Sequence, residues 1–127
     1  MDRFIMNGYI WRISFVNPAS PMLVDRTGEL RVATTDPENL TVYLSDMLTG
    51  EFLITVLIHE LGHCALFSFN LIDDIHYVVD RKHWYEAEEW VCNLIANYGR
   101  EIFSIAKDFL GDYAWTLIPS ELEKIIA

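Results

Sequence analysis

Two histidines and a glutamate interrupt an apolar run, TVLIHELGHCALFSF, at residues 55–69. If this run is helical, residues four apart share one face with Cβ atoms about 5–6 Å apart, so His59 and His63 can direct their imidazoles to one point. Zinc accepts neutral imidazole at about 2.0 Å. Glu60 would then lie beside the ion, where a carboxylate can take a proton from water. This HExxH pattern predicts a zinc site with Glu60 as general base.

The polar groups of this pattern could instead be ordinary core residues. A buried histidine often has its ring nitrogens satisfied by backbone or carboxylate groups, and Glu60 could supply the carboxylate. For one histidine that would be the simpler interpretation. Here His59, Glu60 and His63 would each cost about 1–3 kcal/mol if left unpaired, whereas one metal ion compensates all of them. We therefore favour the metal site.

A catalytic zinc also needs a third protein ligand and one open position. The metzincin pattern HExxHxxGxxH would need glycine and histidine where this chain has Leu66 and Phe69, so that class is excluded. The segment EAEEWVCNLIANYG, residues 86–99, offers three carboxylates, namely Glu86, Glu88 and Glu89. A carboxylate ligand from a second helix is the gluzincin arrangement.

The residues of these two segments resemble a known family. IHELGH, followed about 25 residues later by a helix of the form Glu-x-x-Ala-Asn-x-Phe-Ala, is similar to the ImmA/IrrE-type zinc metallopeptidases, and residues 89–96 follow that form with conservative changes. The resemblance covers about residues 50–98. It implies a minimal, gluzincin-like HExxH domain with one zinc ion per chain, in which Glu89 is the third ligand.

The sequence departs from this family at several points. Cys92 stands where the family usually has alanine, Ile95 stands where it has phenylalanine, and the Leu-Leu-Met-Pro that often follows is missing. These departures leave open which glutamate binds. On an inward helical stripe, Glu89 would share a face with Cys92 and Ala96, small residues that permit close approach to the first helix.

Other polar side chains are candidates for related roles. His76 or His83 could replace the glutamate as third ligand, which would make the protein SprT-like. Glu86, which comes three positions before Glu89, and Asn93 could each orient a ligand. A hydrogen-bond donor could also stabilise the developing oxyanion. The candidates for that role are Tyr77, His83, Tyr85 and Tyr113.

Alternating patterns before the HExxH motif predict a small sheet. YIWRISFV at 9–16 is β-branched and aromatic, and NPASP then ends the strand. Residues 23–35 indicate two short strands around a turn at 26–28, and LTVYLSD at 40–46 alternates as a half-buried strand does. We expect these strands to form an antiparallel sheet.

Helical spacing follows the predicted sheet. It holds over residues 49–69, and after a less regular linker it returns at 84–99, where a glycine closes the second helix. A third helix at about 101–110 and a short one opened by Pro-Ser at 119–120 complete the chain. We expect an α+β fold in a single domain, residues 1–127. A small antiparallel N-terminal sheet would pack on the active-site helix, followed by the glutamate helix and C-terminal helices, in a zincin-like arrangement.

Composition limits the partners and the location of the chain. The 127 residues carry a net charge of -10 and no basic stripe that would suit a phosphate backbone, so we expect no direct binding to nucleic acid. Residues 52–72 have about the length of a membrane span, but the charged groups at their centre argue against insertion. Cys64 and Cys92 lie in apolar helical patterns, and MDRFIMNGYIWR lacks the apolar region of a secretory signal. We expect a reduced, cytoplasmic protein.

Together these features predict a zinc metallopeptidase. Zinc would polarise the scissile carbonyl while Glu60 moves the proton, and the strand at 40–46 could pair with an extended polypeptide substrate by β-addition. The alternative from another class is a non-catalytic, zinc-containing regulatory or partner-binding module of the phage or mobile-element type. Glu60 argues against it, because a closed structural site needs four protein ligands and no acid or base. Neither the substrate nor the oligomeric state follows from the sequence.

Overall fold

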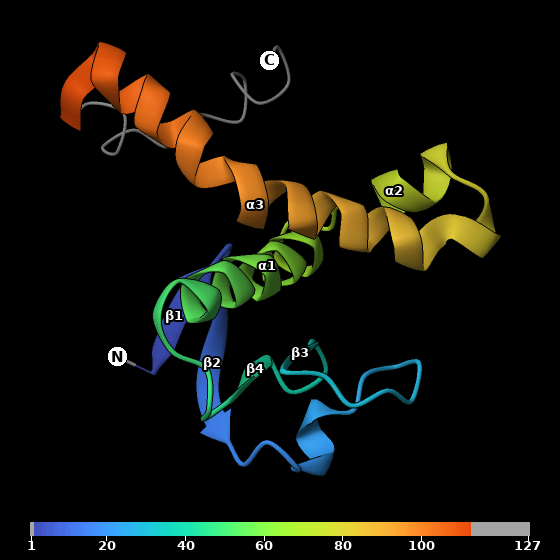
Figure 1. Cartoon of the computed structure of the whole chain (residues 1–127). Coiled ribbons are helices and arrows are strands. Elements are labelled where there is room, and N and C mark those ends of the chain that lie inside the picture. The colour runs from blue at the N-terminus through green and yellow to red at the C-terminus, as the bar shows by residue number, and fades with distance from the viewer. Residues whose placement is uncertain (1, 113–127) are drawn as a thin grey trace. The chain divides into compact units, whose positions relative to one another are not determined.

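The computed structural model describes residues 2–112 (Figure 1). The chain divides into two compact units, residues 1–97 and 98–127. The strands of the first unit are β1 (Arg3–Met6), β2 (Tyr9–Val16), β3 (Ala33–Asp36) and β4 (Thr41–Ser45). Its helices are α1 (Gly50–Ser68), α2 (Ile72–Val78) and the beginning of α3 (Trp84–Leu110). The predicted α+β class is confirmed.

The four strands form one mixed sheet in the order β1-β2-β4-β3. β1 and β2 form an antiparallel hairpin through Asn7 and Gly8, which have the positive φ angles of 48° and 83° that a tight hairpin turn needs. β3 and β4 are also antiparallel, whereas β2 and β4 are parallel. The prediction of an antiparallel sheet is therefore wrong at its centre. The chain between β2 and β4 is long enough for a crossover, which lets β4 run in the same direction as β2.

Residues 23–35 form one of the two predicted strands, since β3 covers the end of this segment. The other strand is reduced to a single antiparallel bridge between Val24 and Leu30, which flanks the predicted turn. Asp25 Oδ1 accepts hydrogen bonds from the amides of Thr27 and Glu29, so this carboxylate closes the segment into a turn. The strand predicted at 40–46 is confirmed as β4, and β1 is an additional strand that was not predicted.

The helices agree with the prediction at α1 and differ after it. α1 occupies the predicted run and ends just before Asn70, whose φ is 56°. α2 forms inside the predicted linker. The second and third predicted helices are one, because α3 passes through Gly99 without ending. Glycine inside a helix costs about 1 kcal/mol, which the helix-forming residues that follow it can offset. The helix predicted at 119–120 lies outside the described residues.

α1 is also long and apolar enough to cross a membrane, judged by length and composition. A single helix of this kind is weak evidence, since the core helix of a soluble protein has the same properties. Several α1 side chains, among them Glu60, Cys64 and Leu66, are buried within the protein. The cytoplasmic location therefore stays a prediction.

The core lies between one face of the sheet and α1, which Figure 1 shows lying against the strands. Trp11, Val42 and Leu44 from the strands are fully buried together with Cys64 from α1. Trp11 Nε1 donates a hydrogen bond of 2.8 Å to Ser68 Oγ, which satisfies two polar groups that burial would otherwise penalise. This bond ties the C-terminal end of α1 to β2, so the sheet fixes the position of the helix that carries the HExxH motif.

α1 and α3 approach closely at the glycine of the HExxH motif. A Cβ built on Gly62 would lie 3.1 Å from Cys92 Sγ and 3.4 Å from Cys92 Cα. Cys92 and Ala96 are buried, as the predicted inward stripe of α3 requires. Burial raises the pKa of both cysteine thiols, Cys64 and Cys92, to about 12, so they behave as small apolar groups. These small residues allow the two helices to bring their polar side chains together.

The substitution Gly62→Ala tests this close packing. Alanine gains about 1 kcal/mol of helix propensity, but overpacking against Cys92 costs about 1–3 kcal/mol, so we expect the free energy of unfolding to fall by roughly 1 kcal/mol. In a Cys92→Ala background the crowding sulfur is gone, and the same change should stabilise the protein. Urea denaturation of the single and double variants measures both effects. An equal effect in both backgrounds would show that Cys92 does not limit the approach of α3.

Candidate metal centre

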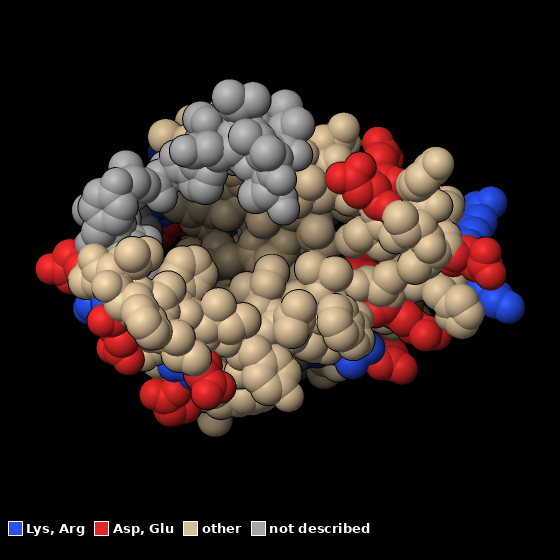
Figure 2. Space-filling view, turned by 90° about the horizontal axis from the view of Figure 1, so that it is seen from above, with Lys and Arg blue, Asp and Glu red and all other residues tan. Residues whose placement is uncertain are grey.

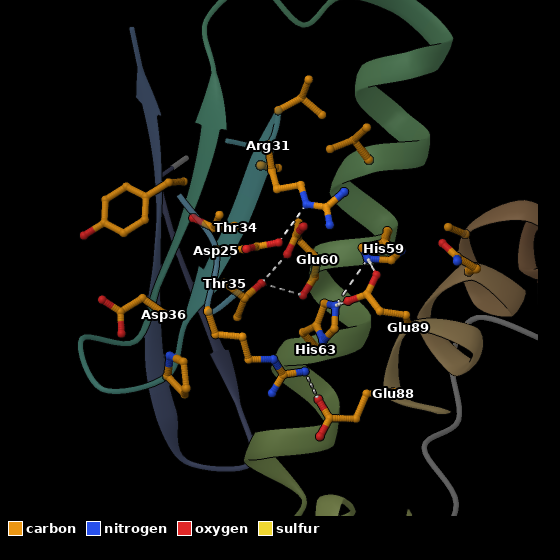
Figure 3. Close-up of a pocket in the computed structure, with 18 of the residues that line it drawn as sticks. Asp25, Arg31, Thr34, Thr35, Asp36, His59, Glu60, His63, Glu88 and Glu89 are labelled. Atoms are coloured by element: carbon orange, nitrogen blue, oxygen red, sulfur yellow. Dashed lines mark hydrogen bonds and ion pairs between the residues drawn. The ribbon is translucent and has the colours of Figure 1, made fainter. Parts of the chain in front are cut away.

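Two histidines of α1 and one glutamate of α3 converge where the helices meet. The Nε2 atoms of His59 and His63 are 3.2 Å apart. Glu89 places Oε1 2.9 Å from His63 Nε2 and Oε2 3.3 Å from His59 Nε2. Figure 3 shows the carboxylate of Glu89 facing both rings. The structure thus brings together the three residues that the sequence predicted as ligands, in a group that could hold a metal ion.

The spacing of these atoms fits a zinc ion. With bonds of about 2.0–2.1 Å, the ligand atoms of a tetrahedral site lie roughly 3.3 Å from one another. The separation of the two histidine nitrogens, 3.2 Å, is close to that value, and Glu89 reaches each of them with a different oxygen, at 2.9 and 3.3 Å. Two imidazole nitrogens and a carboxylate oxygen are a donor set that zinc accepts, and three ligands leave one position open. The geometry admits zinc without excluding other divalent ions of similar preference.

Electrostatics in the cluster favour a positive charge. The hydrogen bonds from His59 and His63, helped by their charges, hold the pKa of Glu89 well below its usual value although burial opposes this. Burial alone would lower the pKa of His59, but the hydrogen bond to Glu89 and the charges of Glu60 and Glu89 outweigh it, so the pKa is raised. A site that stabilises a protonated imidazole beside a carboxylate also stabilises a bound cation, and the two compete.

Glu60 lies beside this cluster but is turned toward the sheet. The residue is buried, with 6% of its surface exposed. The hydroxyl of Thr35, on β3, donates to Glu60 Oε2 at 2.5 Å and also lies 3.3 Å from the carbonyl oxygen of Glu60. Figure 3 shows this pair on the strand side of α1, opposite Glu89. Glu60 is therefore next to the three potential ligands and not one of them.

A cavity of about 800 Å³ opens over the cluster. It is lined by β3, by α1 from Phe52 to Phe67, and by α3 from Tyr85 to Asn97. We predicted that the strand at 40–46 could pair with an extended substrate by β-addition, and that prediction is wrong. β4 lies between β2 and β3, so both of its edges are occupied. The hairpin that follows the crossover puts β3 at the outside of the sheet, and β3 is the edge strand that lines the cavity.

An ion-pair network holds the loop before β3 against α3. Arg26 donates to Glu88 Oε2 at 2.6 Å, and its guanidinium lies 4.6 Å from the centre of the Tyr85 ring. Glu88 is 5% exposed, and its Oε1 lies 3.4 Å from His76 Nε2. His76 stacks on Trp84 with ring centroids 3.7 Å apart. Because the buried carboxylate accepts from the guanidinium of Arg26 and lies beside the His76 ring, it avoids the penalty of an unpaired charge, and the network braces one wall of the cavity.

The alternative ligands predicted from the sequence lie away from the cluster. His76 contacts Glu88, as described above. His83 Nδ1 lies 3.5 Å from Glu86 Oε2, and both side chains are largely exposed. Neither histidine belongs to the group that could hold a metal ion among the described residues. This arrangement favours Glu89 over either histidine as third ligand, and it places Glu86 too far out on the surface to orient one.

Of the residues predicted to orient a ligand or to stabilise an oxyanion, two line the cavity. Asn93 is one, and its side-chain hydrogen bond contributes to the raised pKa of His59. Tyr85 is the other, and its pKa is raised, mainly by burial, so the phenol keeps its proton and can donate a hydrogen bond. Tyr77 is 91% exposed and does not line this cavity, while Tyr113 lies outside the described residues. Tyr85 is therefore the best placed of the tyrosines considered for an oxyanion.

Several residues around the cavity were not predicted from the sequence. Thr35 is one, and the turn before β3 supplies the others. The Thr27 hydroxyl and the guanidinium of Arg31 hydrogen-bond to Asp25 and hold its pKa well below the usual value. The only available signals were the alternation of β3, which puts Thr35 on the same face as the buried Ala33, and the turn-forming Asp25.

Comparison of the chain with family models, with curated proteins and with solved structures finds no match. The resemblance to the ImmA/IrrE-type metallopeptidases, which came from IHELGH and residues 89–96, therefore stays a prediction. The function of the chain has to be inferred from the side chains that surround the cavity.

Proposed function

We propose that this protein is a zinc-dependent metallopeptidase that hydrolyses peptide bonds of a protein substrate. The observation that carries the proposal is the convergence of His59, His63 and Glu89 in one cluster, with the carboxylate of Glu60 beside it. Two imidazoles, a carboxylate and a separate buried carboxylate at the floor of an open cavity are the groups that metal-assisted hydrolysis needs. A closed structural site would use a fourth protein ligand in place of the open position.

The roles of the residues follow from their places around the cavity. His59, His63 and Glu89 would hold the ion. When bound, zinc polarises the scissile carbonyl and lowers the pKa of a coordinated water to about 7. Glu60 takes the proton from the attacking water and delivers it to the leaving amine. Tyr85, which carries its proton, can donate a hydrogen bond to the developing oxyanion.

The open edge of β3 supports a polypeptide as substrate. An extended segment can add to an edge strand through main-chain hydrogen bonds, whereas a central strand such as β4 offers no free edge. β3 lines the cavity along its length, so a segment paired with it would pass over the cluster. The net charge of -10, and the acidic side chains that outweigh basic ones on the face in Figure 2, make a polyanion such as nucleic acid an unfavourable partner.

The first prediction of this proposal concerns the third ligand. Purified protein should contain one zinc ion per chain, and Glu89→Ala should lower the zinc affinity by orders of magnitude because it removes one of three ligands. Glu86→Ala is a matched control, since Glu86 lies on the same helix with its side chain 76% exposed. Its zinc affinity should stay near that of the wild type. Competition with a chromogenic chelator measures both.

The same titration addresses the histidine alternatives. A residue that only orients a ligand typically changes metal affinity by about 10- to 100-fold, less than loss of a ligand does. If His76→Ala or His83→Ala produced the largest loss, Glu89 would not be the third ligand and the SprT-like alternative would replace the gluzincin-like one. If His59→Ala/His63→Ala retained as much zinc as the wild type, the proposed centre would be wrong.

The second prediction concerns Glu60. Glu60→Gln keeps an oxygen that can accept from Thr35 but removes the base, so zinc content and stability should survive while hydrolysis falls by about 10²- to 10⁴-fold. The substrate for this measurement is a proteome-derived peptide library, in which new termini are identified by mass spectrometry. Loss of zinc would instead mean that Glu60 coordinates. Identical termini from both proteins would favour the non-catalytic regulatory or partner-binding module.

A further inference from the structure

We propose that Thr35 is a positioning residue that aims the carboxylate of Glu60 for proton transfer. This inference rests on the proposed function, because it assigns Thr35 a part in the same hydrolysis. No feature of the HExxH motif identifies Thr35, which lies on a different element, 25 residues earlier in the chain.

The hydrogen bond has only one possible direction. An ionised carboxylate can accept but not donate, so the Thr35 hydroxyl is the donor, and Glu60 Oε2 at 2.5 Å is a nearer acceptor than the Glu60 carbonyl oxygen at 3.3 Å. A hydrogen bond to a charged acceptor is short and strong, and the low exposure of Glu60 shields this one from competing water. Thr35 holds Oε2 and leaves Oε1 as the oxygen that receives the proton.

The strand makes Thr35 a rigid support. β-branched side chains are restricted at χ1, so the hydroxyl of a threonine in a strand has few orientations. Ala33, two positions earlier on the same face, is buried in the core, and Thr34 on the other face donates to the carbonyl of Met22 at 2.7 Å. β3 is therefore fixed on both faces, and the position of Glu60 Oε2 is fixed with it.

The backbone of Thr35 faces the edge where the substrate would pair. The carbonyl of Val32 accepts from the amide of Ser45 on the β4 side, and hydrogen-bonded and non-hydrogen-bonded pairs alternate along an antiparallel ladder. Thr35, opposite Val42, then belongs to a non-hydrogen-bonded pair, with its N–H and C=O directed to the open edge. Thr35 thus offers its backbone to an extended substrate and its hydroxyl to Glu60. The same residue would therefore fix the position of the scissile bond relative to the base.

A purely structural role would consist of fastening α1 to β3, and two variants separate the roles. Thr35→Val keeps the shape and the backbone edge but removes the hydroxyl, while Thr35→Ser keeps the hydroxyl and removes a methyl group. Neither touches a metal ligand, so zinc content should not change. If Thr35 positions Glu60, Thr35→Val should lower kcat by about 10- to 100-fold with little change in KM, because misplacing a reacting group by about 1 Å is enough for such a loss.

The kinetic substrate is the library peptide that the zinc-loaded wild type cleaves fastest, and thermal unfolding of each variant serves as the folding control. We expect Thr35→Ser to retain most of the wild-type kcat, even if it unfolds at a lower temperature than Thr35→Val. A wild-type kcat in Thr35→Val, with Glu60→Gln inactive, would overturn this inference and leave the proposed function standing. So would a loss confined to KM, or a kcat that follows unfolding temperature across the variants. No cleavage difference between wild type and Glu60→Gln would overturn the proposed function itself, and this inference with it.

Discussion

Pairing of buried carboxylates is the constraint on which the arrangement of this protein depends. Glu60 and Glu88 are almost fully buried, and an unpaired charge in such a place would cost several kcal/mol. Each is matched by a group from another element. Thr35 on β3 serves Glu60, and Arg26, from the loop before β3, serves Glu88 together with His76 of α2. The polar contacts that satisfy the buried carboxylates of α1 and α3 therefore also hold β3, the loop before it and α2 around the cavity.

Close packing supplies the second half of this arrangement. Glu89 can reach both histidines because Gly62 and Cys92 let α3 approach α1. The position of α1 is set in turn from the other side, where Trp11 of β2 binds Ser68. A change of a few tenths of an ångström between the helices would move the carboxylate relative to two fixed imidazoles. The glycine of the HExxH motif thus contributes to the geometry of the centre without any polar group of its own.

The sequence predicted what depends on local spacing. Residues four apart on a helix must share a face, so the meeting of His59 with His63 followed from α1 alone. The choice of Glu89 within the acidic segment followed from its place on the stripe with Cys92 and Ala96, together with the family resemblance. Non-local features did not follow. The direction of β4 relative to β2 depends on a crossover that no local pattern specifies, and the continuation of α3 through Gly99 depends on residues beyond it.

The same limit explains why Thr35 and the edge strand were missed. In the sequence, the strand at 40–46 directly precedes the helix that carries the HExxH motif, and it was therefore expected at the cleft, but hairpin pairing places β3 outside it. Register then decides which side chains of β3 meet α1, because a slip of one residue would turn every side chain to the other face. A slip would expose the buried Ala33 and bring Thr34 in place of Thr35 against Glu60. Burial of Ala33 therefore fixes the register that gives Glu60 its hydrogen bond from Thr35. The geometry of the candidate metal centre depends on the register of the β3–β4 hairpin as well as on the spacing of the HExxH motif.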